Sequence, residues 1–479
     1  MMTDRSNRFL LSLCLIVLFS GAGGCSREEA ETSRPKPANI LLIVADALRA
    51  DHLGCYGEEL PTSPNIDALS REGALFEDYH TQVPTTLSSF ITLFTSLPPK
   101  HHGASRNGMN PAPDLDFIGE AFQRAGYETV CFISSYSLSS RFGTRRGFDL
   151  FDEKLDCATG LPSNKLIRSA ESVTEAFLAW HEKRDSKRPF FAVVHYFDPH
   201  WPYIPPERFA KIFLHEEGAP DQASMEDMEN ARKMLEAGAG PGDPTLQAFH
   251  SLYCAEIRYM DHEMGRVMDH LREESRIGDT LVVFTADHGE TFWEHEDYFN
   301  HGLSVYATNL RIPLIFWQPG RIAPGRFSTP RFSNLDLAPT LLGLAGIPKP
   351  KGFAGLNLQN LLAGTAPEQV PSCLFAEATK PRSAEKPNTR PNFFKAKCIM
   401  QGPWKLIWTP YKNGQEELYN VEEDQEELLN RIKDPSLAGL RKELMEKLRA
   451  WAKDARGDRP EKGMPQEVED KLKALGYGN

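Results

Sequence analysis

Residues 39–46 read Asn-Ile-Leu-Leu-Ile-Val-Ala-Asp, an unbroken apolar run that ends on a carboxylate. Because the run is continuous rather than alternating, it predicts a strand that is covered on both faces, as strands of parallel sheets are. Residues 128–133, 189–196 and 280–286 have the same character. Helical patterns fall between these runs, the clearest within residues 252–271. Strands separated by helices predict an α/β fold with a mostly parallel central sheet sandwiched by helices.

Polar side chains follow the predicted strands. Asp46 follows the first, His200 lies just after the third, and Asp287 and His288 follow the fourth. The carboxyl ends of parallel strands meet at one edge of an open α/β sheet, where ligands bind. Two carboxylates and one imidazole suit a hard or borderline cation, so Asp46, Asp287 and His288 are predicted to bind one divalent metal ion. The alternative is that each Asp caps a helix and that the His is only hydrogen-bonded.

A candidate nucleophile lies in residues 83–96, which begin with Pro84 and hydroxyl residues and then become apolar. This pattern predicts a helix that begins near Thr86. Backbone N–H groups and the positive end of the helix dipole would there favour an ionised nucleophile and an anionic substrate. Judged on this segment alone, Thr85 and Thr86 are more often N-caps than catalysts.

The composition is that of a folded, acidic protein. The chain has 479 residues, of which 54 are Lys or Arg and 66 are Asp or Glu, for a formal net charge of −12. With 41% hydrophobic residues it can build a large core, which excludes a disordered chain. The acidic balance argues against a nucleic-acid partner. Any bound anion must therefore be held by a local positive charge, a metal ion or a helix N-terminus.

Residues 1–24 are predicted to be an export signal. Arg5 and Arg8 precede an apolar stretch that is too short to span a bilayer comfortably, and small residues precede Cys25. This arrangement resembles a bacterial lipoprotein signal, so we expect a lipid anchor at Cys25 as the protein's only membrane contact, followed by a tether over residues 25–37. The expected location is periplasmic or associated with the outer membrane. The alternative is ordinary cleavage and a secreted product.

Two domains are expected after the tether. Residues 38–365 form the predicted catalytic domain, and residues 366–479 form a small α+β subdomain with short antiparallel strands and one charged helix. Residues 205–245 read as an acidic insertion near the site, which is either a lid or a solvated excursion.

The ordered motifs resemble the sulfatases of the alkaline phosphatase superfamily. The opening strand with Asp46, the Asp198-Pro-His200 and Asp287-His-Gly motifs, and Asn300-His301-Gly match in order and spacing over nearly the whole mature chain. The resemblance implies an alkaline phosphatase/sulfatase-like fold. It also implies one divalent metal ion, Ca²⁺ by the resemblance, with Zn²⁺ or Mn²⁺ plausible from the His ligand. The implied substrate is a sulfate or phosphate ester of a small molecule or glycan.

The chain departs from formylglycine sulfatases at the nucleophile. Those enzymes carry a Cys or Ser two residues before a Pro or Ala and four residues before an Arg. Here the three positions are Thr86, Ser88 and Phe90. The family also carries a second metal-binding carboxylate directly after the first, but here Ala47 follows Asp46. A Lys-x-x-His pocket motif expected from the family is missing as well. Formylglycine chemistry is therefore ruled out, and the chain is similar to threonine-nucleophile members of the superfamily, which implies Thr86 as the nucleophile.

The resemblance implies a metal-dependent hydrolase that forms a covalent Thr86 ester. His200 or His301 would protonate the leaving oxygen, and Arg49 and Arg141 are candidate anion contacts, although a helix-surface role is at least as probable for each Arg. Phosphorus is favoured over sulfur, since a threonine sulfate has no obvious low-energy route to breakdown. Two alternatives stay open, a phospho-head-group transferase that acts on envelope glycans and a catalytically degenerate glycan- or anion-binding protein.

Overall fold

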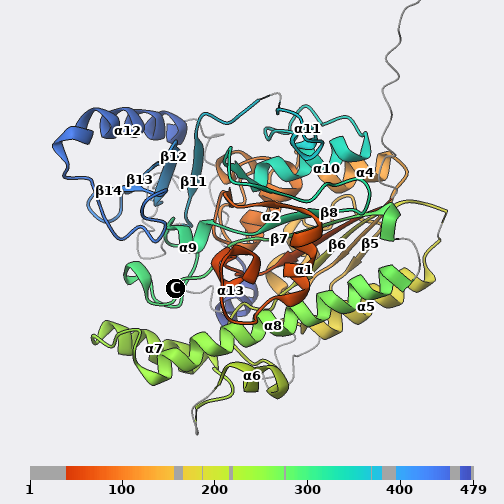
Figure 1. Cartoon of the computed structure of the whole chain (residues 1–479), viewed down its shortest axis with the longest axis horizontal. Coiled ribbons are helices and arrows are strands. Elements are labelled where there is room, and N and C mark those ends of the chain that lie inside the picture. The colour runs from red at the N-terminus through yellow and green to blue at the C-terminus, as the bar shows by residue number, and fades with distance from the viewer. Residues whose placement is uncertain are drawn as a thin grey trace, which may run out of the picture. The chain divides into compact units, whose positions relative to one another are not determined.

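The site is built on an eight-stranded sheet of strand order β5-β4-β6-β1-β7-β8-β2-β9 (Figure 1). The computed structural model describes residues 39–155, 166–185, 187–214, 219–273, 277–367, 369–379, 395–453 and 464–475. The strands of this sheet are β1 (Asn39–Ala45), β2 (Ala74–Phe76), β4 (Glu128–Phe132), β5 (Leu150–Asp152), β6 (Phe190–Tyr196), β7 (Thr280–Ala286), β8 (Leu314–Trp317) and β9 (Gly325–Phe327). All four strands predicted from continuous apolar runs are present.

The centre of the sheet is parallel and buried on both faces. Ile43 of β1 pairs with Val194 of β6 and with Phe284 of β7, and every residue of these three strands is buried. Only β8 runs antiparallel to its neighbours β7 and β2. The predicted mostly parallel sheet is confirmed.

Helices cover both faces of the sheet. Figure 1 shows α2 (Thr86–Thr95), α4 (Ile118–Arg124) and α10 (Leu337–Ala345) on one side, and α1 (Pro64–Glu72), α5 (Ala170–Lys183) and α8 (Pro244–Glu273) on the other. The helical pattern seen in residues 252–271 is the C-terminal part of α8. The remaining short elements are β3 (Tyr79–His80), β10 (Phe332–Ser333), α3 (Pro99–His102), α9 (Ala307–Leu310) and α11 (Gln359–Leu362).

The predicted insertion is docked on the domain rather than solvated. Its described part contains α6 (Glu207–Phe213) and α7 (Met225–Glu236), and α7 buries apolar side chains in the main core. Arg232 of α7 donates from Nε to the carbonyl of Tyr298 at 3.1 Å and from Nη2 to the carbonyl of Phe299. The insertion is thus hydrogen-bonded to the segment that leads to His301.

The C-terminal subdomain is α+β, as predicted. Its antiparallel sheet has the order β11 (Leu374–Glu377), β12 (Lys397–Gln401), β13 (Trp404–Thr409) and β14 (Gln415–Asn420). Helix α12 (Ala438–Lys453) buries Leu444 and Leu448 against this sheet, whereas α13 (Gln466–Ala474) joins the core of the α/β domain.

The described residues contain neither a membrane-spanning helix nor a disulfide. The predicted signal, the tether and Cys25 lie outside the described residues. Among the described residues, no helix is both long and apolar enough to cross a bilayer. None of the described cysteines forms a disulfide, and Cys131, Cys254 and Cys398 are buried.

Candidate metal centre and active site

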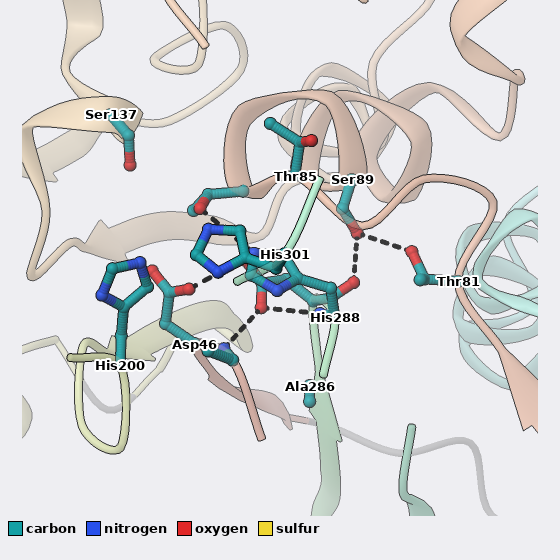
Figure 2. Close-up of polar contacts among 12 residues, drawn as sticks. Asp46, Thr81, Thr85, Ser89, Ser137, His200, Ala286, His288 and His301 are labelled. Carbon is teal, nitrogen blue, oxygen red and sulfur yellow. Dashed lines mark hydrogen bonds and ion pairs between the residues drawn. The ribbon is translucent and has the colours of Figure 1, made fainter. Parts of the chain in front are cut away.

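Asp46, Asp287 and His288 lie together at the carboxyl ends of β1 and β7. Figure 2 shows Asp46 beside His288. Ala45 is the register partner of Ala286, so the two chains leave the sheet side by side. The Nε2 atom of His288 is 3.5 Å from Oδ1 of Asp46 and 3.5 Å from Oδ2 of Asp287. The ligand atoms of the three residues lie within 4.8 Å of one another, and all three residues are buried. The predicted cluster is therefore assembled as expected.

The polar atoms of this cluster fit a divalent cation. Among the described residues, neither carboxylate oxygen of Asp46 nor Oδ2 of Asp287 has a hydrogen-bond partner, although all three atoms are buried. Such atoms are costly unless an ion or a donor compensates them. His288 donates from Nδ1 to the carbonyl of Gly289 at 2.8 Å, which leaves the lone pair of its Nε2 facing the carboxylates. The donor set is two carboxylates and one imidazole, the set that was predicted.

The carboxylates of the cluster resist ionisation without a nearby cation. Burial raises the pKa of Asp46 to about 7, and His288 opposes this rise. Burial and the charge of Asp46 raise the pKa of Asp287 to about 7. A bound divalent cation would restore the ionised form of both groups, because its charge outweighs the cost of desolvation.

Thr86 lies at the first turn of α2, beside the cluster. Its Oγ1 is 3.4 Å from Nε2 of His288. Thr85 is the N-cap residue of α2 in an extended conformation, but its side chain makes no capping hydrogen bond and instead pairs with the hydroxyl of Thr379. The structure therefore does not support the side-chain N-cap alternative for Thr85. It places the Thr86 hydroxyl beside the cluster of candidate metal ligands.

A hydrogen-bond network holds α2 against the segment that follows β7 and carries Asp287. Ser89 donates from Oγ to the carbonyl oxygen of Asp287 at 2.7 Å. Asn334 donates from Nδ2 to Ser89 at 3.0 Å and to Thr81 at 3.1 Å. Because these residues are buried, the network holds the helix that carries Thr86 in a fixed position relative to Asp287.

His200 and His301 complete the group of histidines seen in Figure 2. The ring of His301 stacks on His288 with centroids 4.4 Å apart and lies 4.9 Å from the ring of His200. Burial lowers the pKa of His200 to about 3 and that of His301 well below its ordinary value. Burial therefore favours the neutral form of both rings. Their role in proton transfer stays a prediction.

The two arginines predicted to contact the anion lie in different surroundings. Arg49 is buried, and its guanidinium pairs with Asp51 and with Glu294, each at 2.7 Å. Arg141 is exposed, and its charge acts on Glu467 of α13. Because Arg49 is buried, the helix-surface alternative does not describe it, and an anion contact by either residue stays a prediction.

Two buried residues beside the site were missed from the sequence. His195 of β6 has its Nε2 atom 3.4 Å from Oδ2 of Asp46, and Glu290 has a carboxylate oxygen 3.3 Å from Nδ1 of His301. His195 sits inside an apolar run, which gives no signal of function. Glu290 directly follows the Asp287-His288-Gly289 motif, and this position could have identified it.

Two family models and a curated relative match this chain. The sulfatase family model matches residues 38–347, and the model of the N-sulphoglucosamine sulphohydrolase C-terminal region matches residues 294–454. The arylsulfatase of Clostridium perfringens is 27% identical over 381 residues, covering 68% of this chain and 78% of that protein.

Solved structures show the same fold. BT4656 in complex with its substrate D-glucosamine-2-N,6-O-disulfate has a TM-score of 0.71 at 21% identity, covering 89% of this chain and 100% of that chain. The phosphonate monoester hydrolase of Agrobacterium radiobacter has a TM-score of 0.69 at 22% identity, covering 86% of this chain and 96% of that chain.

Proposed function

The chain belongs to the sulfatase family, since the family model matches residues 38–347 of its 479, and from this premise we propose that it is a metal-dependent hydrolase of sulfate or phosphate esters with Thr86 as its nucleophile. One observation carries the proposal. The Thr86 hydroxyl lies 3.4 Å from Nε2 of His288, within the buried cluster that also contains Asp46 and Asp287. No formylglycine precursor occupies this position, so the hydroxyl itself is the available nucleophile.

The reaction is proposed to pass through an ester of Thr86. The Oγ1 atom forms a bond to sulfur or phosphorus while the bond to the leaving oxygen breaks. A divalent ion held by Asp46, Asp287 and His288 would lower the pKa of the Thr86 hydroxyl and offset negative charge on a non-bridging oxygen. The N-terminal end of α2 favours the same charge through the helix dipole.

Proton transfer is assigned to the neighbouring histidines. His200 has its Nδ1 tied to the carbonyl oxygen of Trp201, which only accepts, so Nε2 of the neutral ring carries the lone pair. His200 or His301 takes up the proton released by Thr86 and delivers it to the leaving oxygen. In the second step water displaces the ester from Thr86 and the proton moves in the reverse direction.

The proposed substrates are sulfate or phosphate esters of small molecules or glycans. The chemistry of the intermediate favours phosphate esters as substrates. Water at a metal centre readily hydrolyses a threonine phosphoester, whereas a threonine sulfate lacks the elimination route that formylglycine provides. The structural likeness to BT4656, whose substrate is a sulfated glucosamine, supports glycan esters as substrates. The phosphonate monoester hydrolase shows that this fold also serves phosphorus chemistry.

Metal identity and location are part of the proposal. Ca²⁺ is favoured by the resemblance to sulfatases, and Zn²⁺ or Mn²⁺ by the imidazole ligand of His288. The basic and apolar start of the sequence supports export with a lipid anchor at Cys25, or secretion if cleavage occurs without lipid attachment.

The experiment measures metal content and the turnover of an aryl sulfate, a phosphate diester and a phosphonate ester. We expect Thr86→Ala to lower kcat/KM by at least about 10³-fold, because it removes the nucleophile. Thr85→Ala is the matched control, since Thr85 pairs with Thr379 rather than with the metal-binding residues.

Other outcomes would overturn parts of this proposal. Full activity in the Thr86→Ala variant would refute the nucleophile. A wild-type protein with no metal and no turnover of the three substrates would favour the degenerate binding protein. A product in which the phosphoryl group is attached to an added alcohol rather than to water would favour the transferase.

A further inference from the structure

His195 is a buried histidine that the proposed reaction does not use. It lies in β6, between β1 and β4 in the sheet, and has no exposed surface. Its Nε2 atom is 3.4 Å from Oδ2 of Asp46. Among the described residues, neither of these two buried atoms has a hydrogen-bond partner.

The position of the proton on His195 follows from its other nitrogen. The backbone N–H of Ser134 donates to Nδ1 at 3.2 Å. Because a backbone N–H only donates, Nδ1 is the unprotonated nitrogen and the proton of the neutral ring lies on Nε2. The ring nitrogen that carries the proton is therefore the one that lies 3.4 Å from a carboxylate oxygen of Asp46.

Two further contacts hold His195, one to its ring and one to its backbone carbonyl. Phe90 of α2 packs edge-on against it, with centroids 5.1 Å apart and planes at 89°. Ser134 also donates from its hydroxyl to the backbone carbonyl of His195. One side chain thus contacts the Asp46 end of β1, the loop that follows β4 and the helix that begins at Thr86.

We propose that His195 is a positioning residue of the metal site, whose Nε2–H holds Oδ2 of Asp46 so that Oδ1 is presented to the cation beside His288. The inference rests on the proposed function, because Asp46 must be a metal ligand. Donors behind a ligand of this kind fix its orientation, and their loss commonly weakens metal binding by about 10- to 100-fold.

Two substitutions separate the contacts of His195. His195→Asn keeps an acceptor near the position of Nδ1 for the Ser134 N–H but removes the donor to Asp46. His195→Gln can place an amide N–H near the position of Nε2 but gives up the bond to Ser134. Positioning of Asp46 therefore predicts weaker metal binding in the Asn variant and recovery in the Gln variant.

His181→Asn is the control for the loss of a buried imidazole. His181 lies in α5, packs on Phe190 and is 3.0 Å from a nitrogen of His270. This variant is expected to lower the unfolding temperature as much as His195→Asn does, without a change in metal affinity.

The test is titration of the chelator-stripped full chain with Ca²⁺, Mn²⁺ and Zn²⁺ in turn, together with thermal unfolding. For an ion that the wild type binds, we expect the dissociation constant to rise about 10- to 100-fold in His195→Asn and by less than about 3-fold in His195→Gln. Equal affinity of the wild type and His195→Asn, or equal loss in both His195 variants, would overturn this inference alone. If the wild type binds none of the three ions, the proposed function fails and the inference fails with it.

Discussion

The hydroxyl oxygen of Thr86 lies 3.4 Å from Nε2 of His288, although 202 positions of sequence separate the two residues. The same nitrogen is 3.5 Å from carboxylate oxygens of Asp46 and Asp287. His288 is thus the point at which the candidate nucleophile and both candidate carboxylate ligands meet.

His288→Asn is expected to shift metal preference toward Ca²⁺. The substitution replaces an imidazole nitrogen by an amide oxygen, and hard cations prefer oxygen ligands. The ratio of the dissociation constants for Zn²⁺ and Ca²⁺ should rise by about 10-fold or more. His301→Asn is the control, since His301 stacks on His288 and lies outside the cluster of candidate ligands. An unchanged ratio in His288→Asn would show that this nitrogen does not bind the ion.

Metal removal is expected to destabilise the protein most at alkaline pH. In the metal-free protein the pKa values of Asp46 and Asp287 are raised from 3.8 to about 7. The folded state then binds more protons than the unfolded state, so the contribution of these groups is full below about pH 4 and is lost as the pH rises through 7. A metal ion that binds only the folded protein adds about 2.7 kcal/mol at 100 times its dissociation constant.

Thermal unfolding from about pH 5 to pH 9, with and without the ion, measures this effect. Asp46→Asn removes one buried charge, so its metal-free form should unfold at a higher temperature than metal-free wild type at about pH 8. It should also gain little stability when the ion is added. Equal stabilisation of both proteins by the ion would contradict the assignment of Asp46 as a ligand.

A second pair of buried carboxyl groups gives a separate pH prediction. Burial raises the pKa of Asp198 to about 6 and that of Glu256 well above its ordinary value, and the two side chains share a hydrogen bond. Glu256 also accepts from the N–H of Ile204 at 2.6 Å. Since both carboxyl pKa values are raised, the stability that these groups contribute is lost as the pH rises above about 6.

Glu256→Gln keeps both hydrogen bonds without a titrating group. We expect it to raise the unfolding temperature at about pH 8 and to have little effect at about pH 5. Glu207→Gln is the control, because Glu207 is exposed on α6. A loss of stability at alkaline pH in Glu256→Gln would show that the pair does not share a proton.

Arg232→Met is expected to raise KM more than it lowers kcat. Arg232 donates to the carbonyls of Tyr298 and Phe299 and lies over the ring of Trp201 at 5.5 Å, so it ties the insertion to the segments that carry His301 and His200. Loss of these bonds to a charged group should cost about 1.5–3 kcal/mol of stability. Steady-state kinetics and thermal unfolding measure both effects.

Glu229→Gln distinguishes the hydrogen bonds of Arg232 to the carbonyls of Tyr298 and Phe299 from its surface ion pair with Glu229. Glu229 is 3.4 Å from Arg232 and is half exposed, so its substitution should cost less than about 1 kcal/mol and leave KM unchanged. Equal effects of the two substitutions would refute the role of Arg232 in holding the loops.

Cys25→Ser is expected to release the protein from membranes. If Cys25 carries the lipid, its loss removes the acyl chains that anchor the exported protein. Fractionation of producing cells should move the protein from the membrane to the soluble fraction, and mass spectrometry of the wild type should detect acyl groups. Soluble wild-type protein without acyl groups would support the secreted form instead.

Much of the fold and of the candidate metal site could be predicted from local sequence. Continuous apolar runs identified β1, β4, β6 and β7, because strands buried on both faces have no polar alternation. The residues after β1 and β7 then had to converge, because parallel strands end at the same edge of a sheet. The N-terminal position of Thr86 in α2 followed from the hydroxyl residues before an apolar helix.

The protonation states of the site could not be read in the same way. Burial lowers the pKa of His200 to about 3. Arg49 was a candidate anion contact, yet its guanidinium pairs with the nearby Asp51 and with Glu294, which lies 245 positions further along the chain. Both properties depend on desolvation and on partners that the local sequence does not reveal.

The sequence by itself therefore determined the α/β class, the strands and the identity of the Asp46, Asp287 and His288 cluster, because these follow from local hydrophobicity and from the geometry of parallel strands. Only the tertiary structure decided that His195 faces Asp46, that Arg49 forms an ion pair with Glu294 and that burial lowers the pKa of His200 and of His301. The physical reason is that hydrogen-bond partners and dielectric surroundings are set by packing between segments that lie far apart in the chain.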